Sequence, residues 1–146
     1  MNRITARLLA ATLALVLLAS CGETEAPTGK WEGYSESANW LLGVRLKVDP
    51  GNVIHATALS INVTDTSLPE RQALAEKMQT MMPEQWKTAT RSKVDFRDNV
   101  IHKVGGIAPL FIYDPKRRTM TFTFYARGKL TEHVKLKPVE KFMDED

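Results

Sequence analysis

The stretch WLLGVRLKV, residues 40–48, decides the fold. Apolar side chains stand at every second position of it, at Trp40, Leu42, Val44, Leu46 and Val48. This is the period of a β-strand with one face in a core. Arg45 and Lys47 fall on the opposite face, which we expect to be in water. The turn residues 49–52 (DPGN) lead into a second apolar strand over 53–63, which predicts an antiparallel hairpin.

Further short strands are predicted on both sides of this hairpin. One precedes it, over residues 30–35, and the others follow at 92–97, 99–104, 108–113, 119–126 and 130–137. Turn residues mark the reversals between them. In strand 119–126, Met120, Phe122 and Phe124 are expected to point inward. Because the connections are short, neighbouring strands should be antiparallel.

One helix is predicted, over residues 67–82 approximately. Ser67 and Glu70 form a capping-box pattern at its start. An apolar stripe follows, made of Leu74, Ala75, Met78, Met81 and Met82. At this helical spacing we favour core packing for the methionines over a soft binding surface. Pro83 is expected to end the helix, and residues 84–90 to form a short turn that returns Trp86 to the core.

These elements predict a single α+β domain, mainly β, over residues 30–143. The expected architecture is an antiparallel meander of seven or eight strands, forming a small barrel or sandwich, with the helix between the third and fourth strands. The acidic residues 144–146 are expected to form a tail. Gly29-Lys30-Trp31 resembles the glycine, any residue, tryptophan signature of calycins, the lipocalin-like ligand barrels. The long helix departs from the usual lipocalin order.

Residues 1–20 have the features of a secretion signal. Arg3 and Arg7 make the start positive, and the apolar stretch 8–19 contains no acidic residue. That stretch of about 12 residues spans roughly 18 Å as a helix, which is too short for a hydrocarbon core of about 30 Å. We therefore expect a cleaved signal and not a permanent membrane span.

Leu18-Ala19-Ser20-Cys21 resembles the lipobox of bacterial lipoproteins. The resemblance implies diacylglycerol transfer to the Cys21 thiol, cleavage before Cys21, and acylation of its amine. In that family an aspartate after the cysteine commonly retains the protein at the inner membrane. Since Gly22 stands there, the resemblance favours the outer membrane, facing the periplasm. Residues 21–29 would then be the lipidated N-terminus and a flexible tether.

Cysteine and histidine chemistry is limited in this chain. Cys21 is the only cysteine, so no intramolecular disulfide or cysteine-rich zinc site can form. Alternation places His55 and His102 on apolar faces that point inward, and His133 on a wet face. We interpret them as core or rim histidines and predict no metal, cofactor or catalytic residue. Residues 33–37 (GYSES) lack the second glycine of a nucleophile elbow.

The body of the chain is basic, with 18 basic and 12 acidic residues over 30–143. The most suggestive surface is Lys116, Arg117 and Arg118 at a hairpin tip, with Arg127, Lys129, Lys135 and Lys137 on neighbouring strands. A solvated sheet face is the simpler interpretation, and an anionic ligand such as phospholipid or lipopolysaccharide is the alternative. Export argues against nucleic acid.

The favoured interpretation is a non-enzymatic envelope lipoprotein. It would be anchored by the lipid on Cys21 and would bind a partner protein or an amphipathic or anionic ligand beside the membrane. Two alternatives stay open. One is a hydrolase acting on envelope material, which inward His55 and His102 with a carboxylate would support. The other is an inhibitor of a hydrolase that inserts the loop 114–118 into a cleft.

Overall fold

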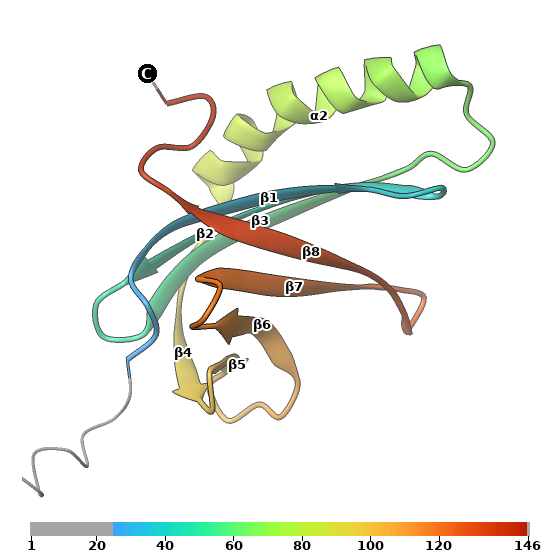
Figure 1. Cartoon of the computed structure of the whole chain (residues 1–146). Helices are drawn as coiled ribbons and strands as arrows, with labels where there is room; N and C mark the ends of the chain where they lie inside the picture. The colour runs from blue at the N-terminus through green and yellow to red at the C-terminus, as the bar shows by residue number, and fades with distance from the viewer. Residues whose placement is uncertain (1–24, 146) are drawn as a thin grey trace, which may run out of the picture.

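The computed structural model describes residues 25–145, with all their side chains except those of 130 and 131. Eight antiparallel strands follow one another around a closed barrel, and the last strand pairs with the first (Figure 1). The strands are β1 (Gly29–Glu36), β2 (Trp40–Asp49), β3 (Val53–Asn62), β4 (Arg91–Arg97), β5 (Val100–Lys103), β6 (Pro109–Asp114), β7 (Thr119–Ala126) and β8 (Lys129–Val139). The predicted mainly-β fold is confirmed, as a barrel and not a sandwich. The signal 1–20, Cys21 and Gly22 lie outside the described residues.

The barrel interior is filled by the apolar side chains that alternation predicted. The alternating residues of β2 and of β7 all belong to this core, together with partners from the other strands, among them Trp31, Ile54, Val94, Ile101, Phe111, Val134 and Leu136. On β7, Met120 is fully buried, and Phe122 and Phe124 pack against the core as expected. Tight interior packing of this kind is the main source of stability in a domain without disulfides.

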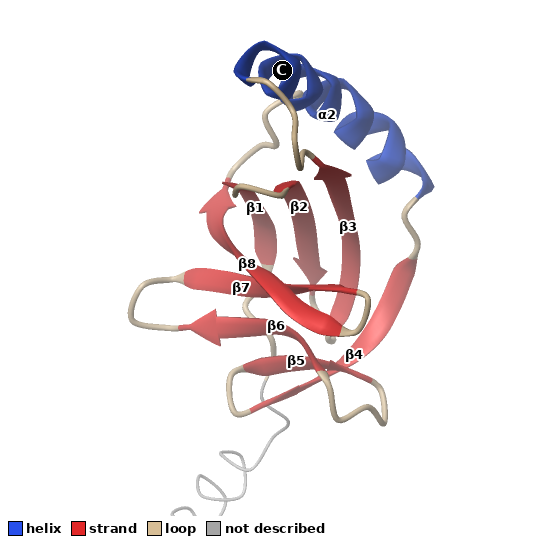
Figure 2. Ribbon diagram, turned by 90° about the vertical axis from the view of Figure 1, so that its right-hand side faces the viewer, coloured by secondary structure: helices blue, strands red, loops and turns tan. Residues whose placement is uncertain are grey.

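Helix α2 (Leu68–Thr88) connects β3 to β4 and lies across the outer face of β1–β3 (Figure 2). A second apolar cluster forms beneath it, made of Leu41, Leu59, Val63, Met78 and Met82. The C-terminal segment 140–145 lies beside the same face (Figure 1). The expectation that Arg45 lies in water is therefore wrong, since only 1% of its surface is exposed. Lys47, on the same face of β2, keeps 37% of its side chain exposed, so the cover over this face is partial.

The helix begins as predicted and ends later. Ser67 is its N-cap, and the reciprocal capping box with Glu70 is present. The helix continues through Pro83 to Thr88, so the predicted end near residue 82 is wrong. Pro83 removes the hydrogen bond to the Gln79 carbonyl. Packing of Met82 and Trp86 on either side of the proline holds the helix against the sheet despite that loss.

The barrel closes where β1 crosses β8. Lys30, Trp31 and Glu32 pair with residues 137–139 of β8. A Cβ added at Gly33 would lie 2.3 Å from the carbonyl oxygen of Lys135, closer than any side chain can approach. Glycine at this position therefore permits the crossing that closes the barrel.

The N-terminal segment packs against the end of the barrel. Ala26 is buried in the core, and its backbone N–H donates to Oδ1 of Asn52 in the β2–β3 turn at 2.8 Å. The described part of the tether expected over 21–29 is thus held on the barrel. This segment and the β5–β6 connection lie on the side of the barrel away from α2, at the bottom of both views (Figures 1 and 2).

Candidate functional site

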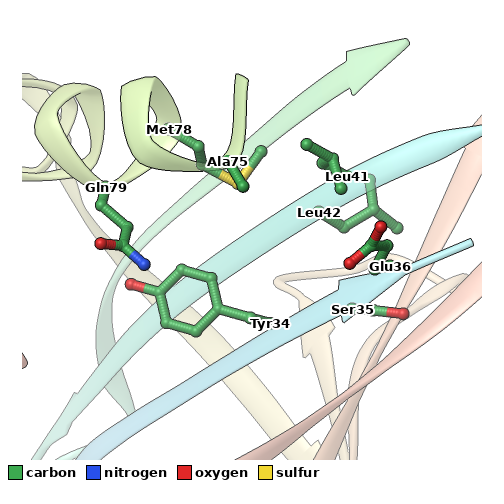
Figure 3. Close-up of a pocket in the computed structure, with 8 residues that line it drawn as sticks. All are labelled: Tyr34, Ser35, Glu36, Leu41, Leu42, Ala75, Met78 and Gln79. Carbon is green, nitrogen blue, oxygen red and sulfur yellow. The ribbon is translucent and has the colours of Figure 1, made fainter. Parts of the chain in front are cut away.

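A cleft of about 200 Å³ opens between α2 and the outer face of β1 and β2 (Figure 3). Its lining residues are Tyr34, Ser35, Glu36, Leu41, Leu42, Ala75, Met78 and Gln79. The middle of the cleft is apolar, and Tyr34 and Gln79 point toward one another at one end (Figure 3). The cleft therefore offers an apolar slot with hydrogen-bonding groups at its rim.

A shallower groove of about 260 Å³ continues along the first half of α2. It shares Glu36 and Ala75 with the cleft and adds Leu68, Arg71 and Gln72. Leu68 is 78% exposed, a high value for a leucine. Arg71 is held in place because its guanidinium donates to the carbonyl oxygens of Ser37 at 2.7 Å and Ala38 at 2.9 Å. Because these bonds hold the Arg71 side chain, it forms a fixed wall of the groove near Leu68.

Gly43 allows the helix and Tyr34 to pack on β2. A Cβ at this position would lie 2.7 Å from the Met82 methyl carbon and 3.0 Å from the Tyr34 ring. A side chain at this position would displace the flexible end of Met82 and crowd the Tyr34 ring. The glycine therefore leaves room for both side chains at the floor of the cleft.

A buried charge cluster lies on the same face of the sheet. Nε of Arg45 donates to Oε2 of Glu32 at 2.7 Å, and its Nη2 pairs with Oδ1 of Asp144. The guanidinium also lies over the Phe142 ring, 4.9 Å from the centroid. Although burial disfavours the charge, the hydrogen bond to Asp144 and the charge of Glu32 raise the pKa of Arg45. The cluster attaches the C-terminal segment to β2.

The acidic residues of the C-terminal segment are paired. Despite partial desolvation, the hydrogen bond from Arg45 lowers the pKa of Asp144. Lys30 donates to Oε2 of Glu145 at 2.7 Å, and this bond lowers the pKa of Glu145. Burial raises the pKa of Tyr34, with a further contribution from Glu32, while Arg45 opposes the rise. Asp144 and Glu145, which were expected to belong to an acidic tail, are therefore paired with Arg45 and Lys30 of the barrel.

The histidines are not where alternation suggested. His55 shares a face with Leu59, but that face lies outside the barrel, where its ring stacks on Trp86 at 4.0 Å. On β5, Ile101 and not Val100 enters the core, and His102 lies opposite Asp95 of β4. The prediction that both histidines face the interior is wrong, because α2 covers the outer face at His55 and Ile101 takes the inward position next to His102 on β5. Neither histidine lines the cleft, the groove or the interior cavity.

One small cavity lies inside the barrel. It has a volume of about 180 Å³ and is lined by Leu42, Val44, Ala58, Leu59, Ser60, Phe122 and Phe124. Pockets that enclose drug-sized ligands have volumes of about 300–1,000 Å³. At about 180 Å³ this cavity is smaller than that range, and its lining residues Ala58 and Ser60 are exposed to solvent.

The basic surface predicted from the sequence divides into two parts. Lys116, Arg117 and Arg118 occupy the β6–β7 turn, whereas Arg127 and Lys129 lie at the β7–β8 turn. The eight residues of β7 separate these turns by about 26 Å. Lys135 lies opposite Thr121 and so belongs to the first group. The residues of this surface therefore lie in two groups at the two ends of β7, and their binding of an anionic ligand stays a prediction.

The sequence reasoning missed Tyr34, Gln79 and the Glu32–Arg45–Asp144 cluster. The sequence carries one signal for the cluster. Leu41 makes the second face of β2 partly apolar, and Arg45 is a charged residue on that same face. Within residues 25–145, no group of three or more histidine or acidic side chains is placed to hold a metal ion. The helix in that range is not long and apolar enough to cross a bilayer.

Comparison with known proteins gave no relatives. Models of protein families, curated proteins and solved structures were searched, and none matches this chain.

Proposed function

We propose that this chain is a lipid-anchored envelope protein whose barrel binds a partner protein through the cleft beneath α2. The observation that carries the proposal is the apolar cleft and its continuation along α2, bordered by the exposed side chains of Tyr34 and Leu68. Exposed aromatic and aliphatic side chains around an apolar slot are typical of protein-binding surfaces.

The size of the cleft favours a partner protein over a free lipid. At about 200 Å³, it lies below the range of pockets that enclose drug-sized ligands. One or two apolar side chains of a partner fill such a space, and the adjoining groove accommodates the rest of the segment. Tyr34, Ser35 and Gln79 at the rim supply donors and acceptors for the partner's backbone.

The anchor is proposed from the lipobox-like sequence at Cys21. Two or more acyl chains give stable attachment to a bilayer, whereas one gives only marginal binding. Residues 22–24 are all that separate Cys21 from the first described residue. Helix α2, which borders the cleft, lies on the other side of the barrel from the N-terminal segment (Figures 1 and 2). The proposed arrangement therefore holds the barrel at the membrane with its binding cleft toward the periplasm.

A matched pair of substitutions on α2 tests the binding site. Ala75 lines the cleft, and Ala73, two residues earlier, is exposed. Ala75→Arg fills the slot, while Ala73→Arg adds the same charge outside it. We expect a partner that co-purifies with the native chain to be retained by Ala73→Arg and lost from Ala75→Arg. Equal retention by both variants would exclude the cleft as the binding site.

The anchor is tested separately with Cys21→Ser. We expect this change to abolish labelling with a radioactive or clickable fatty acid and to release the protein from the membrane or block its processing. Labelling that survives the substitution would show that the lipid, if any, is attached elsewhere.

A further inference from the structure

The β5–β6 connection, residues 104–108, presents apolar side chains to solvent. Ile107 is 92% exposed and Val104 60% exposed. The loop is held in shape: the Gly106 N–H donates to the Lys103 carbonyl at 2.7 Å, and the Gly105 N–H donates to the Asp95 carboxylate at 3.2 Å. The loop therefore holds two exposed aliphatic side chains, Val104 and Ile107, close together at one end of the barrel.

Basic residues surround this loop. Exposed Lys93, Arg97 and Lys103 lie on β4 and β5. Of the two acidic residues on these strands and their turn, Asp95 accepts the loop's own N–H and Asp98 is exposed. The Arg97 guanidinium donates to the Gly106 carbonyl at 3.2 Å, so positive charge lies directly beside the apolar tip. Apolar residues with adjacent lysine and arginine are the composition of surfaces that lie on anionic bilayers.

The described N-terminal segment lies next to two of these basic residues. Glu25 lines one groove together with Lys93 and Arg97. Cys21 lies four positions before Glu25, so even a fully extended chain places Cys21 within about 14 Å of this groove. The β5–β6 loop and the start of the described N-terminal segment lie on the side of the barrel away from α2 (Figures 1 and 2), and Lys93 and Arg97 share a groove with Glu25 of that segment.

We infer that the β5–β6 loop inserts into the anionic lipid surface beside the anchor, with Ile107 and Val104 in the interfacial region and Lys93, Arg97 and Lys103 at the headgroups. The inference rests on the proposed anchoring at Cys21 for its physiological setting. The contact fixes the orientation of the barrel, so that the cleft beneath α2 faces away from the membrane. Apolar faces of interfacial segments enter the bilayer by about 5–10 Å, a depth that two side chains at a loop tip can reach.

The single cysteine makes a direct test possible. When Cys21 carries lipid, a cysteine introduced by Ile107→Cys is the only free thiol of the chain and accepts an environment-sensitive dye. Leu68→Cys, at an exposed apolar residue on α2, is the matched control. Both proteins are reconstituted in vesicles of phosphatidylethanolamine with about one quarter phosphatidylglycerol. We expect the dye at 107 to shift to the blue and to be shielded from aqueous quencher, and the dye at 68 to remain in water.

A second measurement keeps the inference independent of the anchor. A chain that starts at residue 21 with Cys21→Ser retains the whole described barrel and is mixed with excess vesicles of the same composition. Ile107→Asp should weaken its binding to the vesicles by about tenfold or more, because burial of an isoleucine side chain contributes at least the free energy of a tenfold change in affinity. Leu68→Asp should leave the binding unchanged. No difference between these variants, or no binding by the parent, would overturn the inference even if Cys21 is lipidated. Shielding at 107 in native membranes but not in protein-free vesicles would also overturn it, in favour of a protein contact.

Discussion

Replacement of Arg45 is the sharpest test of how the outer face of the sheet is held together. Arg45→Ala removes the 2.7 Å partner of Glu32, whose side chain is only 9% exposed. It also removes the contact with Phe142 and the pairing with Asp144. Breaking a buried pair from one side typically destabilises by about 3–5 kcal/mol, because the remaining charge is left without a partner. A domain of this size is stable by only about 5–15 kcal/mol.

Urea unfolding followed by tryptophan fluorescence measures this loss. With a slope of about 1–3 kcal/mol per molar urea, the midpoint should fall by about 2 M. The double variant Arg45→Met with Glu32→Gln should recover most of the loss, since no buried charge then lacks a partner. Lys87→Met, which breaks the exposed pair with Glu84, is the control and should leave the midpoint unchanged. A loss below about 1 kcal/mol in Arg45→Ala, or a double variant no more stable than the single one, would refute this account of the cluster.

Three further outcomes follow from the packing of the chain. Because the pKa values of Asp144 and Glu145 are lowered by folding, their stabilisation is complete above the unfolded values of 3.8 and 4.5 and is lost as pH falls through the native values. Acid titration followed by tryptophan fluorescence, to which Trp86 beside Phe142 contributes together with Trp31 and Trp40, should show the segment detaching below about pH 4, and Asp144→Asn with Glu145→Gln should remove that transition. Gly33→Ala should lower the thermal midpoint by several degrees, as expected for about 2 kcal/mol of strain at the β1–β8 crossing, whereas an unchanged midpoint would mean that the strands separate freely. Ser67→Ala should cost about 1 kcal/mol in urea unfolding by removing the N-cap of α2, and Ser67→Asp should restore it.

The sequence predicted the barrel strands well because each has an apolar inner face and is bounded by turn residues. The strand over 119–126 has the predicted bounds, and the others differ by one or two residues at their ends. The capping box at Ser67 likewise depends only on neighbouring residues. Local patterns of this kind are visible in a single sequence.

Features that depend on distant contacts were not visible in the same way. Arg45 alternates with apolar residues, which is the pattern of a strand residue that faces solvent. Its burial depends on the C-terminal segment, where its partner Asp144 lies 99 positions later in the sequence. Pro83 normally ends a helix, and only packing against β2 and β3 keeps α2 continuous. Tyr34 and Gln79 line the cleft from β1 and α2, and Gly43 on β2 leaves room between these elements. A glycine adds nothing to the apolar pattern from which a core is predicted.

The pairing of the first strand with the last has a consequence for when the chain can fold. Lys30 of β1 lies opposite Val139 of β8 and bonds to Glu145, 115 positions away in sequence. Until β8 is available, β1 lacks one neighbour and the core has an open side. Folds dominated by such long-range pairing form slowly. A chain that leaves the ribosome from its N-terminus should therefore stay unfolded until almost its whole length is present, which is the state that a translocation channel requires.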